Sequence, residues 1–145
     1  MKKRANTINS CIAGEALVLS YLSKNGLVGV LTYKNTPSFD LIACDEQGEQ
    51  FAAIQIKANK DKNTFMVGNK IECRSDNVWW AFVTLSNSSI LWAKGSEVAN
   101  QPFQKEDGSP QKAKYLTMKQ VTSFAKEDRI MKELFTLSPM DSRLR

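Results

Sequence analysis

The sequence predicts an α/β protein in which helices flank a mixed central β-sheet. Apolar residues recur at helical spacing over 7–25 and again over 117–135, where Thr117-x-x-Gln120 has the spacing of a helix capping box. Between these helices, runs of apolar, β-branched and aromatic residues have the length and composition of strands. The order helix, three strands, irregular loop, two strands, helix predicts one sheet with helices on its faces. The strands are expected over 27–33, 39–44, 51–57, 77–85 and 90–94.

The first predicted helix carries a carboxylate on its apolar side. Glu15 follows Ile12 by three positions and precedes Leu19 by four, so it lies on the apolar stripe. The neighbouring Gly14 would let this helix approach a sheet closely. Glu15 is therefore either a partly exposed residue at the edge of the stripe or a functional ligand.

Two of the strands are expected in the interior of the sheet. The almost continuous apolar character of 27–33 suits a strand buried on both faces. The segment 77–85 is the strongest strand signal and is expected to be central. Adjacent strand residues point to opposite faces, so Trp79 and Trp80 are more consistent with core packing than with base stacking.

Composition limits both the architecture and the chemistry. The 145 residues, of which 42% are hydrophobic and 24% charged, suit a single domain over 1–145. The chain has no histidine, which excludes Ser-His-Asp catalysis, Cys-His catalysis and imidazole-ligated metal sites. Three cysteines without close spacing suggest neither a disulfide framework nor a zinc knuckle, and we expect them to be small buried hydrophobes.

The same features bear on location and partners. No segment has the length and apolarity that a membrane helix needs, so we expect a cytoplasmic protein without a membrane partner. The net charge of +5 is compatible with a polyanionic partner without requiring one. We expect no nucleotide cofactor.

A β-hairpin organises the middle of the chain. Two apolar runs, 39–44 and 51–57, flank a polar turn that ends in glycine, which is typical of a hairpin. If the four residues 45–48 form the loop, Asp40 lies opposite Ala53.

This pairing places three polar side chains on one face of an otherwise apolar ribbon. Because side chains alternate along each strand, Asp40 is expected to share a face with Gln55 and Lys57, and to lie diagonally from Gln55. A carboxylate, an amide and an ammonium at such a position must be paired, hydrated or bound to a metal ion.

An Asp followed by a hairpin and Gln-x-Lys resembles the core motif of the PD-(D/E)XK nuclease superfamily. With Gln55 in the middle, the motif is most similar to the Mrr-like and Holliday-junction-resolvase-like branches. The Gly14-Glu15 pair looks like the element that supplies a Glu from the first helix in that family. The resemblance runs from about Ala13 to Ala99 and implies a restriction-endonuclease-like core of the order αβββ…β.

The resemblance also implies a catalytic site at Glu15, Asp40, Gln55 and Lys57. Asp40, and Glu15 directly or through water, would bind Mg²⁺ or Mn²⁺, and the Gln55 side-chain oxygen and the Ile56 backbone carbonyl would complete the protein ligands. Lys57 would orient the attacking water and stabilise charge on the phosphate. Gln55 replaces the usual carboxylate with a neutral amide, so metal affinity should be lower than in the commoner pattern.

The segment after the hairpin is basic. Residues 57–74 contain five basic and two acidic residues, and four of the basic residues are candidates for phosphate contacts. The alternative for this segment is a solvated loop without a partner. The candidate DNA-binding residues are Lys60, Lys62, Lys70 and Arg74.

The resemblance therefore implies a metal-dependent endonuclease that hydrolyses phosphodiester bonds of duplex or branched DNA, either Holliday-junction-resolvase-like or Mrr restriction-like. One alternative is a catalytically inactive protein of the same fold, acting as a DNA-binding subunit or as a protein-partner module of the immunity or anti-restriction type. A third is a structural domain in which the polar hairpin has no function. Members of the family often form dimers, so a homodimer is also open, although the sequence reveals no dimer surface.

Overall fold

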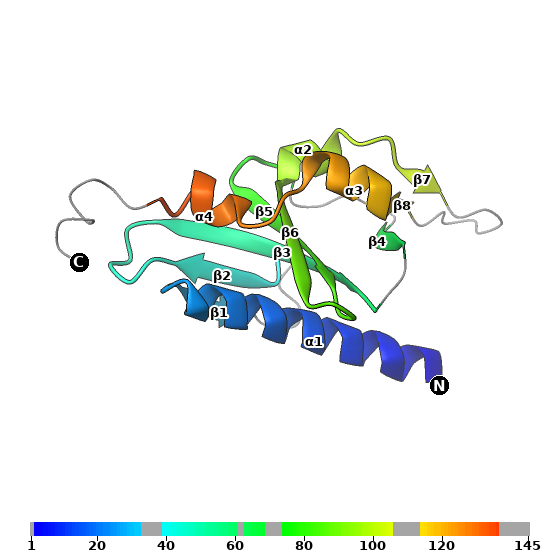
Figure 1. Ribbon diagram of the computed structural model, residues 1–145, viewed down its shortest axis with the longest axis horizontal. Helices are drawn as coiled ribbons and strands as arrows, with labels where there is room; N and C mark the ends of the chain where they lie inside the picture. Colours follow the sequence, from blue (N-terminus) through cyan, green and yellow to red (C-terminus); the bar gives the residue numbers. More distant parts are fainter. Residues whose placement is uncertain (1, 33–38, 61–62, 69–73, 106–113, 137–145) are drawn as a thin grey trace.

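Over its described residues, the computed structural model (Figure 1) contains a long first helix, two β-sheets and three short helices. Among the described residues, no helix has the length and apolar character needed to cross a membrane. The structure describes residues 2–32, 39–60, 63–68, 74–105 and 114–136. The elements are α1 (Lys2–Lys24), β1 (Val28–Leu31), β2 (Leu41–Cys44), β3 (Phe51–Asn59), β4 (Thr64–Gly68), β5 (Val78–Thr84), β6 (Ser89–Lys94), α2 (Gly95–Ala99), β7 (Gln104–Lys105), β8 (Lys114–Thr117), α3 (Met118–Phe124) and α4 (Arg129–Glu133).

The main sheet has five strands in the order β1-β2-β3-β5-β6. It is mixed, because β3 and β5 run parallel while the other neighbouring strands run antiparallel. Helix α1 lies along one face of this sheet, with Val18 and Leu22 fully buried in a core that includes Leu41 and Ile54 (Figure 1). We refer to this side of the sheet as the α1 face.

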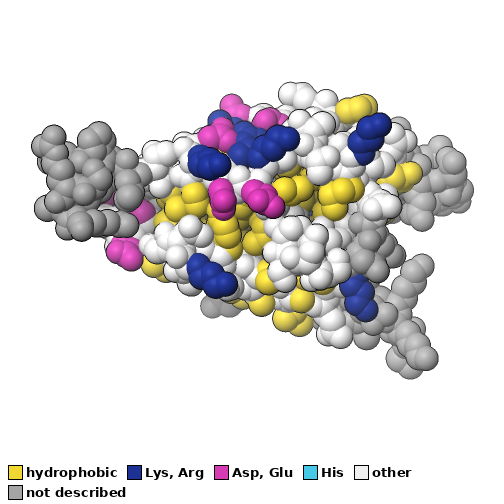
Figure 2. Space-filling model, in the orientation of Figure 1, with side chains coloured by type: hydrophobic (Ala, Val, Ile, Leu, Met, Phe, Trp, Pro, Cys, Tyr) yellow, Lys and Arg dark blue, Asp and Glu magenta, His cyan; other side chains and the backbone are white. Residues whose placement is uncertain are grey.

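A second layer covers part of the opposite face. A three-stranded sheet, β4-β8-β7, packs together with α2 and α3 over β5 and β6, and its core contains Phe65, Trp80, Phe82 and Leu116. Trp79 belongs to the core on the α1 face, so the two adjacent tryptophans point to opposite faces as predicted. Over α2 and α4, acidic and basic side chains are intermixed (Figure 2).

The hairpin loop is longer than predicted. Cys44 pairs with Phe51 and Leu41 with Ile54, and the Asp45 N–H donates to the Gln50 carbonyl, so six residues form the loop. The Asp45 carboxylate accepts hydrogen bonds from the backbone of the same loop, which stabilises the longer turn.

The predicted register was therefore wrong by two positions. Ala53 lies opposite Ile42 and does not face Asp40. Because side chains alternate with a period of two, a shift of two residues keeps the assignment of side chains to faces. Gln55 and Lys57 remain on the face that carries Ile42.

Strand β1 is an edge strand, which contradicts the prediction of burial on both faces. Its side chains alternate between the α1 face and a face that no described helix or strand covers, and Val30 is 60% exposed. Ile42 and Phe51 are exposed on the same uncovered face. We refer to this surface, formed by Val28, Val30, Ile42, Cys44, Phe51 and Ala53, as the open face.

Two further expectations were wrong. The predicted helix over 117–135 is interrupted, because Lys126 makes two backbone hydrogen bonds with Trp92 of β6 and Asp128 adopts a left-handed conformation (φ 56°). Cys11 is exposed and Cys44 is half-buried, so these thiols are not the buried hydrophobes that we expected. Cys73 lies outside the described residues.

Candidate active site

The candidate site lies where β3 continues beyond the end of its neighbour β2. The last ladder pair joins Leu41 to Ile54, and Asp40 lies one residue further, with its N–H still donating to the Ile54 carbonyl (2.8 Å). The Asp40 carboxylate accepts a hydrogen bond from the Ile56 N–H, with a distance of 2.7 Å between Oδ2 and N. The side chain of Asp40 thus replaces the missing strand and is held against the backbone of β3.

Thr32 holds the backbone of Asp40 from the other side. The Thr32 N–H donates to the Asp40 carbonyl (3.0 Å), and Thr32 Oγ1 lies 3.0 Å from the carbonyl oxygens of both Phe39 and Asp40. Sequence reasoning missed this residue. The available signal was a hydroxyl side chain at the end of an apolar strand, which does not by itself identify a contact across the sheet.

Helix α1 brings a second carboxylate to this place. A Cβ atom on Gly14 would lie 2.8 Å from Ala58 Cβ, so only glycine lets α1 approach β3 this closely. The next residue, Glu15, is half-buried, and its pKa is raised by burial and, to a smaller degree, by the charge of Asp40. Glu15 and Asp40 are therefore close enough to repel each other.

The backbone of Ile56 faces the same gap. In a strand, the N–H and C=O of one residue point to the same side, and the Ile56 N–H points to Asp40. The Ile56 carbonyl is thus directed toward the side of β3 that β2 has left. Successive residues of a strand direct these groups to opposite sides, so the Asn59 carbonyl, three residues after Ile56, should point toward β5. It accepts a hydrogen bond from the Leu85 N–H just after the end of β5, as this alternation requires.

Gln55 and Lys57 approach from the face opposite α1. Gln55 pairs with Trp80 and Lys57 with Phe82 across the parallel ladder, and both aromatic residues belong to the core of the second layer. Lys57 Nζ lies 5.8 Å from the centroid of the Trp80 ring. Within the described part of the chain, the ion pairs within 4.0 Å involve Arg129, and none joins Lys57 to Asp40.

The oxygen donors at this gap fit a hard divalent cation. The charge of Asp40 contributes to the raised pKa of Glu15, and Mg²⁺ or Mn²⁺ would offset this repulsion because both ions prefer carboxylate and carbonyl oxygens. Among the described residues, no three His, Cys, Asp or Glu side chains gather in one place. An ion bound by Glu15 and Asp40 would therefore also need oxygens from groups such as the Ile56 carbonyl and Gln55.

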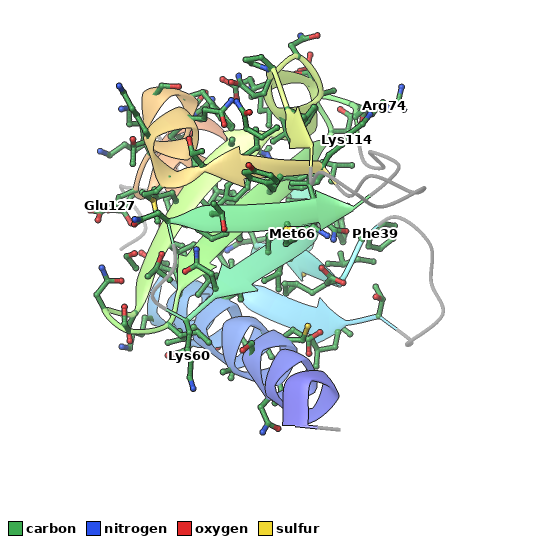
Figure 3. All side chains as sticks on the ribbon, turned by 90° about the vertical axis from the view of Figure 1, so that its right-hand side faces the viewer. Phe39, Lys60, Met66, Arg74, Lys114 and Glu127 are labelled. Atoms are coloured by element: carbon green, nitrogen blue, oxygen red, sulfur yellow. The ribbon has the colours of Figure 1, made fainter. Side chains whose placement is uncertain are left out.

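The basic candidates do not form a single cluster. The Lys60 carbonyl accepts from Ser86 beyond the end of β5, whereas Arg74 precedes the start of β5. A strand of this length spans about 20 Å, and in Figure 3 Lys60 lies at the lower left and Arg74 at the upper right. Lys62 and Lys70 lie outside the described residues.

A cavity of about 260 Å³ lies elsewhere, between α1, the β5–β6 turn and the segment before α4. Its wall includes Tyr21, whose hydroxyl donates to Asp128 Oδ1 (2.7 Å), and burial together with this bond raises the Tyr21 pKa. None of the predicted site residues lines it. We place the candidate site at the edge of β3 because the acidic residues converge there, and an extended polymer needs a surface more than a cavity.

Comparisons with known proteins identify the fold. No protein-family model matches the chain, and no curated protein sequence matches it. Among solved structures, the chain is similar to Hjc, a Holliday junction resolvase from the archaeal hyperthermophile Archaeoglobus fulgidus, with a TM-score of 0.55 and 12% sequence identity. The match covers 85% of this chain and 96% of the resolvase chain. The predicted fold class is thus confirmed: a mixed five-stranded sheet with flanking helices, in the arrangement of this nuclease-like fold.

Proposed function

We propose that the chain is a metal-dependent DNA endonuclease, which hydrolyses phosphodiester bonds in duplex or branched DNA. The observation that carries the proposal is the hydrogen bond from the Ile56 N–H to the Asp40 carboxylate, which holds an acidic side chain against β3, the strand that presents Gln55 and Lys57. The charge of Asp40 also raises the pKa of Glu15 on α1. The likeness of the fold to a Holliday junction resolvase supports a nuclease. Resolvase-like cleavage is our first proposal for the subclass, and Mrr restriction-like cleavage is the second.

The reaction requires positive charge, because both the phosphodiester and the attacking hydroxide are anionic. Mg²⁺ or Mn²⁺, held by Glu15, Asp40, the Gln55 side-chain oxygen and the Ile56 carbonyl, would neutralise phosphate oxygens and lower the pKa of a bound water. A water would attack phosphorus and release its proton to bulk solvent, while the bond between phosphorus and the leaving oxygen breaks and the leaving oxygen takes a proton from solvent.

The protein residues orient and stabilise the groups in this reaction. Asp40 is held at both its backbone and its carboxylate, so it is positioned before any ligand arrives. Lys57 brings an ammonium with three hydrogen-bond donors, which can contact a phosphate oxygen and orient the water. Gln55 contributes no charge, so we expect weaker metal binding than three carboxylates would give.

The proposed partner is DNA, contacted by phosphate-binding side chains at both ends of β5. Lys60 and Arg74, together with Lys62 and Lys70, would contact the backbone without reading sequence. A separation of about 20 Å along the strand spans several phosphates of a duplex, so one DNA molecule could reach both ends.

We also propose that the chain forms a homodimer through the open face. Val30 and Phe51 are 60% and 59% exposed, and the strand register places their side chains on the open face, whose six defining residues carry no charge. The backbone of β1 adds an unpaired edge among the described strands. A second copy fits this surface better than DNA, because DNA binding would require cations there.

A non-catalytic binding protein of the same fold is the second candidate. The neutral Gln55 favours it, because an amide gives a divalent cation no negative charge. It would act as a DNA-binding subunit or as a protein-partner module, and it predicts no metal uptake that depends on Asp40.

Cleavage assays test the proposal directly. Wild type, Asp40→Ala and Lys57→Ala should be compared on duplex, branched and single-stranded DNA with Mg²⁺, with Glu46→Ala as a matched acidic control in the hairpin loop. We expect wild type and the control to nick DNA, and the two site variants to lose this activity. Equal residual cleavage by all four proteins would indicate a contaminating nuclease and contradict the proposal.

A further inference from the structure

The ammonium of Lys57 lies against a buried aromatic ring. Its Nζ is 5.8 Å from the ring centroid of Trp80, which is within the range of a cation–π contact. Trp80 is 2% exposed, so its ring is almost entirely shielded from water. Tryptophan is the aromatic residue with the strongest attraction for a cation.

The second layer fixes the orientation of this ring. Trp80 stacks on Phe82 with 5.9 Å between centroids and an interplanar angle of 29°. Phe82 in turn makes edge contacts with Phe65 of β4 (5.2 Å) and Phe124 of α3 (6.1 Å). The indole therefore packs on a ring, Phe82, that residues of β4 and α3 contact in turn, and it offers Lys57 a rigid surface.

A rigid aromatic partner has two consequences for a lysine at this place. It restricts the rotamers of a long, flexible side chain before a ligand arrives, so less rotamer entropy is lost on binding. It also leaves the positive charge uncompensated, whereas an ion pair with a carboxylate would neutralise it. Lys57 forms no such pair with the described acidic residues.

We propose that Trp80 is a positioning residue for Lys57, which holds the ammonium in place for the phosphate oxygens of the DNA. This inference rests on the proposed nuclease function. It assigns a role in the site to the second layer, because β4 and α3 supply rings that contact Phe82, on which Trp80 stacks.

The neighbouring tryptophan provides a matched control. Trp79 lies on the same strand, is 3% exposed and also faces cations, with Lys94 Nζ at 5.8 Å and Arg129 Cζ at 5.5 Å from its ring. It belongs to the opposite face of the sheet. Replacing Trp79 therefore removes a similar core ring without affecting Lys57.

The first test is spectroscopic and requires no catalysis. In metal-free Asp40→Asn protein, the ε-methylene protons of Lys57 should resonate upfield of those of exposed lysines, because they lie near the face of an indole. The resonance is assigned by its loss in Lys57→Met. Trp80→Leu should abolish the upfield shift, and Trp79→Leu should preserve it. An unshifted Lys57 in the parent protein, or a shift that survives Trp80→Leu, would overturn the inference.

The second test is kinetic, with single-turnover cleavage at saturating DNA. We expect Trp80→Leu to lower the rate about tenfold at unchanged DNA affinity, Trp80→Phe to lower it less, and Trp79→Leu and Trp79→Phe to leave it unchanged. If Trp80→Leu does not fold, the cleavage rates of Trp80→Phe and Trp79→Phe are compared instead, and only the Trp80→Phe rate should be lowered.

Equal rate losses in the Trp79 and Trp80 variants would mean a purely structural role. Absence of Asp40-dependent cleavage in wild type would overturn the proposed function itself. Normal cleavage by Trp80→Leu with a lost upfield shift would overturn only the positioning role.

Discussion

The carboxylate of Asp40 accepts a hydrogen bond of 2.7 Å from the backbone N–H of Ile56. This bond lies where β2 ends, so that one edge of β3 has no paired strand while β5 still pairs with the other edge. This bond ties a site residue to the strand that carries Gln55 and Lys57. The position of the site therefore follows from unequal strand lengths in the sheet.

Thr32 should contribute to the site without contributing much to stability. Thr32→Val removes the hydroxyl shared by the Phe39 and Asp40 carbonyls, so the backbone of Asp40 becomes less constrained. We expect about a fivefold loss of Mn²⁺ affinity, the size of one net hydrogen bond, and a small change in Tm. Calorimetry measures the Mn²⁺ affinity, with Thr122→Val as a control because Thr122 is exposed on α3. Unchanged affinity in Thr32→Val would contradict this role.

Glu15 should destabilise the metal-free protein near neutral pH. Burial and Asp40 raise its pKa above the ordinary 4.5, so the folded state disfavours the ionised form. Protonated Glu15 makes its full contribution to folding stability below pH 4.5, and this contribution is lost as the pH rises through the raised pKa. Glu15→Gln should therefore raise Tm at pH 7 and leave it unchanged at pH 4, as measured by thermal denaturation.

The matched control for this prediction is Glu49→Gln in the exposed hairpin loop, which should leave Tm unchanged at both pH values. Added Mn²⁺ should raise the Tm of wild type and have no effect on Glu15→Gln. A lower Tm for Glu15→Gln at pH 7 would show that the carboxylate is already compensated in the metal-free protein.

Gln55→Glu should strengthen metal binding, because a third carboxylate replaces a neutral amide beside Ile56. We expect about a tenfold increase in Mn²⁺ affinity, together with a lower Tm in the absence of metal because of charge repulsion. Isothermal titration calorimetry and thermal denaturation measure the two effects. Gln50→Glu at the base of the hairpin loop controls for added charge, and equal effects of both variants would refute the assignment.

Gly14 should be required for the approach of α1 to β3. Gly14→Ala places a Cβ 2.8 Å from Ala58 Cβ, and such overpacking costs about 1–3 kcal/mol, more than alanine gains in helix propensity. Urea denaturation should show the loss. The double variant Gly14→Ala/Ala58→Gly should recover part of it, and additive destabilisation in the double variant would argue against this contact.

The open face should mediate self-association. Sedimentation equilibrium of wild type should show a dimer whose population rises with concentration, and Val30→Lys or Phe51→Lys should yield a monomer. Met66→Lys is the control, since Met66 is also exposed but lies on the second sheet. A wild-type monomer at all concentrations, or a dimer that survives both substitutions, would contradict the proposal.

Local patterns predicted the elements, but contacts between them decided the details. The apolar run of β1 was interpreted as doubly buried, because sequence does not show whether a strand has one neighbour or two. The helix break after Phe124 depends on hydrogen bonds between Lys126 and Trp92 of a distant strand. The second sheet was missed because β7 has two residues and β8 has four, too few for a periodic signal.

In the candidate site, too, local patterns were predictable and contacts between elements were not. Glu15 and Asp40 were predicted as site residues from their order in the chain and from the family resemblance, and in the structure the charge of Asp40 contributes to the raised pKa of Glu15. The contacts of Thr32 and Trp80 were not predictable, because each reaches its partner across the sheet. The metal-binding roles of Glu15, Asp40, Gln55 and Ile56 stay predictions.

Calorimetric titration of Mn²⁺ into wild type and Asp40→Asn tests the central claim most directly. Asparagine keeps an oxygen that can accept the Ile56 hydrogen bond, so the variant should fold while losing the charge of the carboxylate. We predict saturable Mn²⁺ binding by wild type that is lost in Asp40→Asn. Absence of binding by wild type, or equal binding by both proteins, would contradict the assignment of a metal site to Asp40 and Glu15.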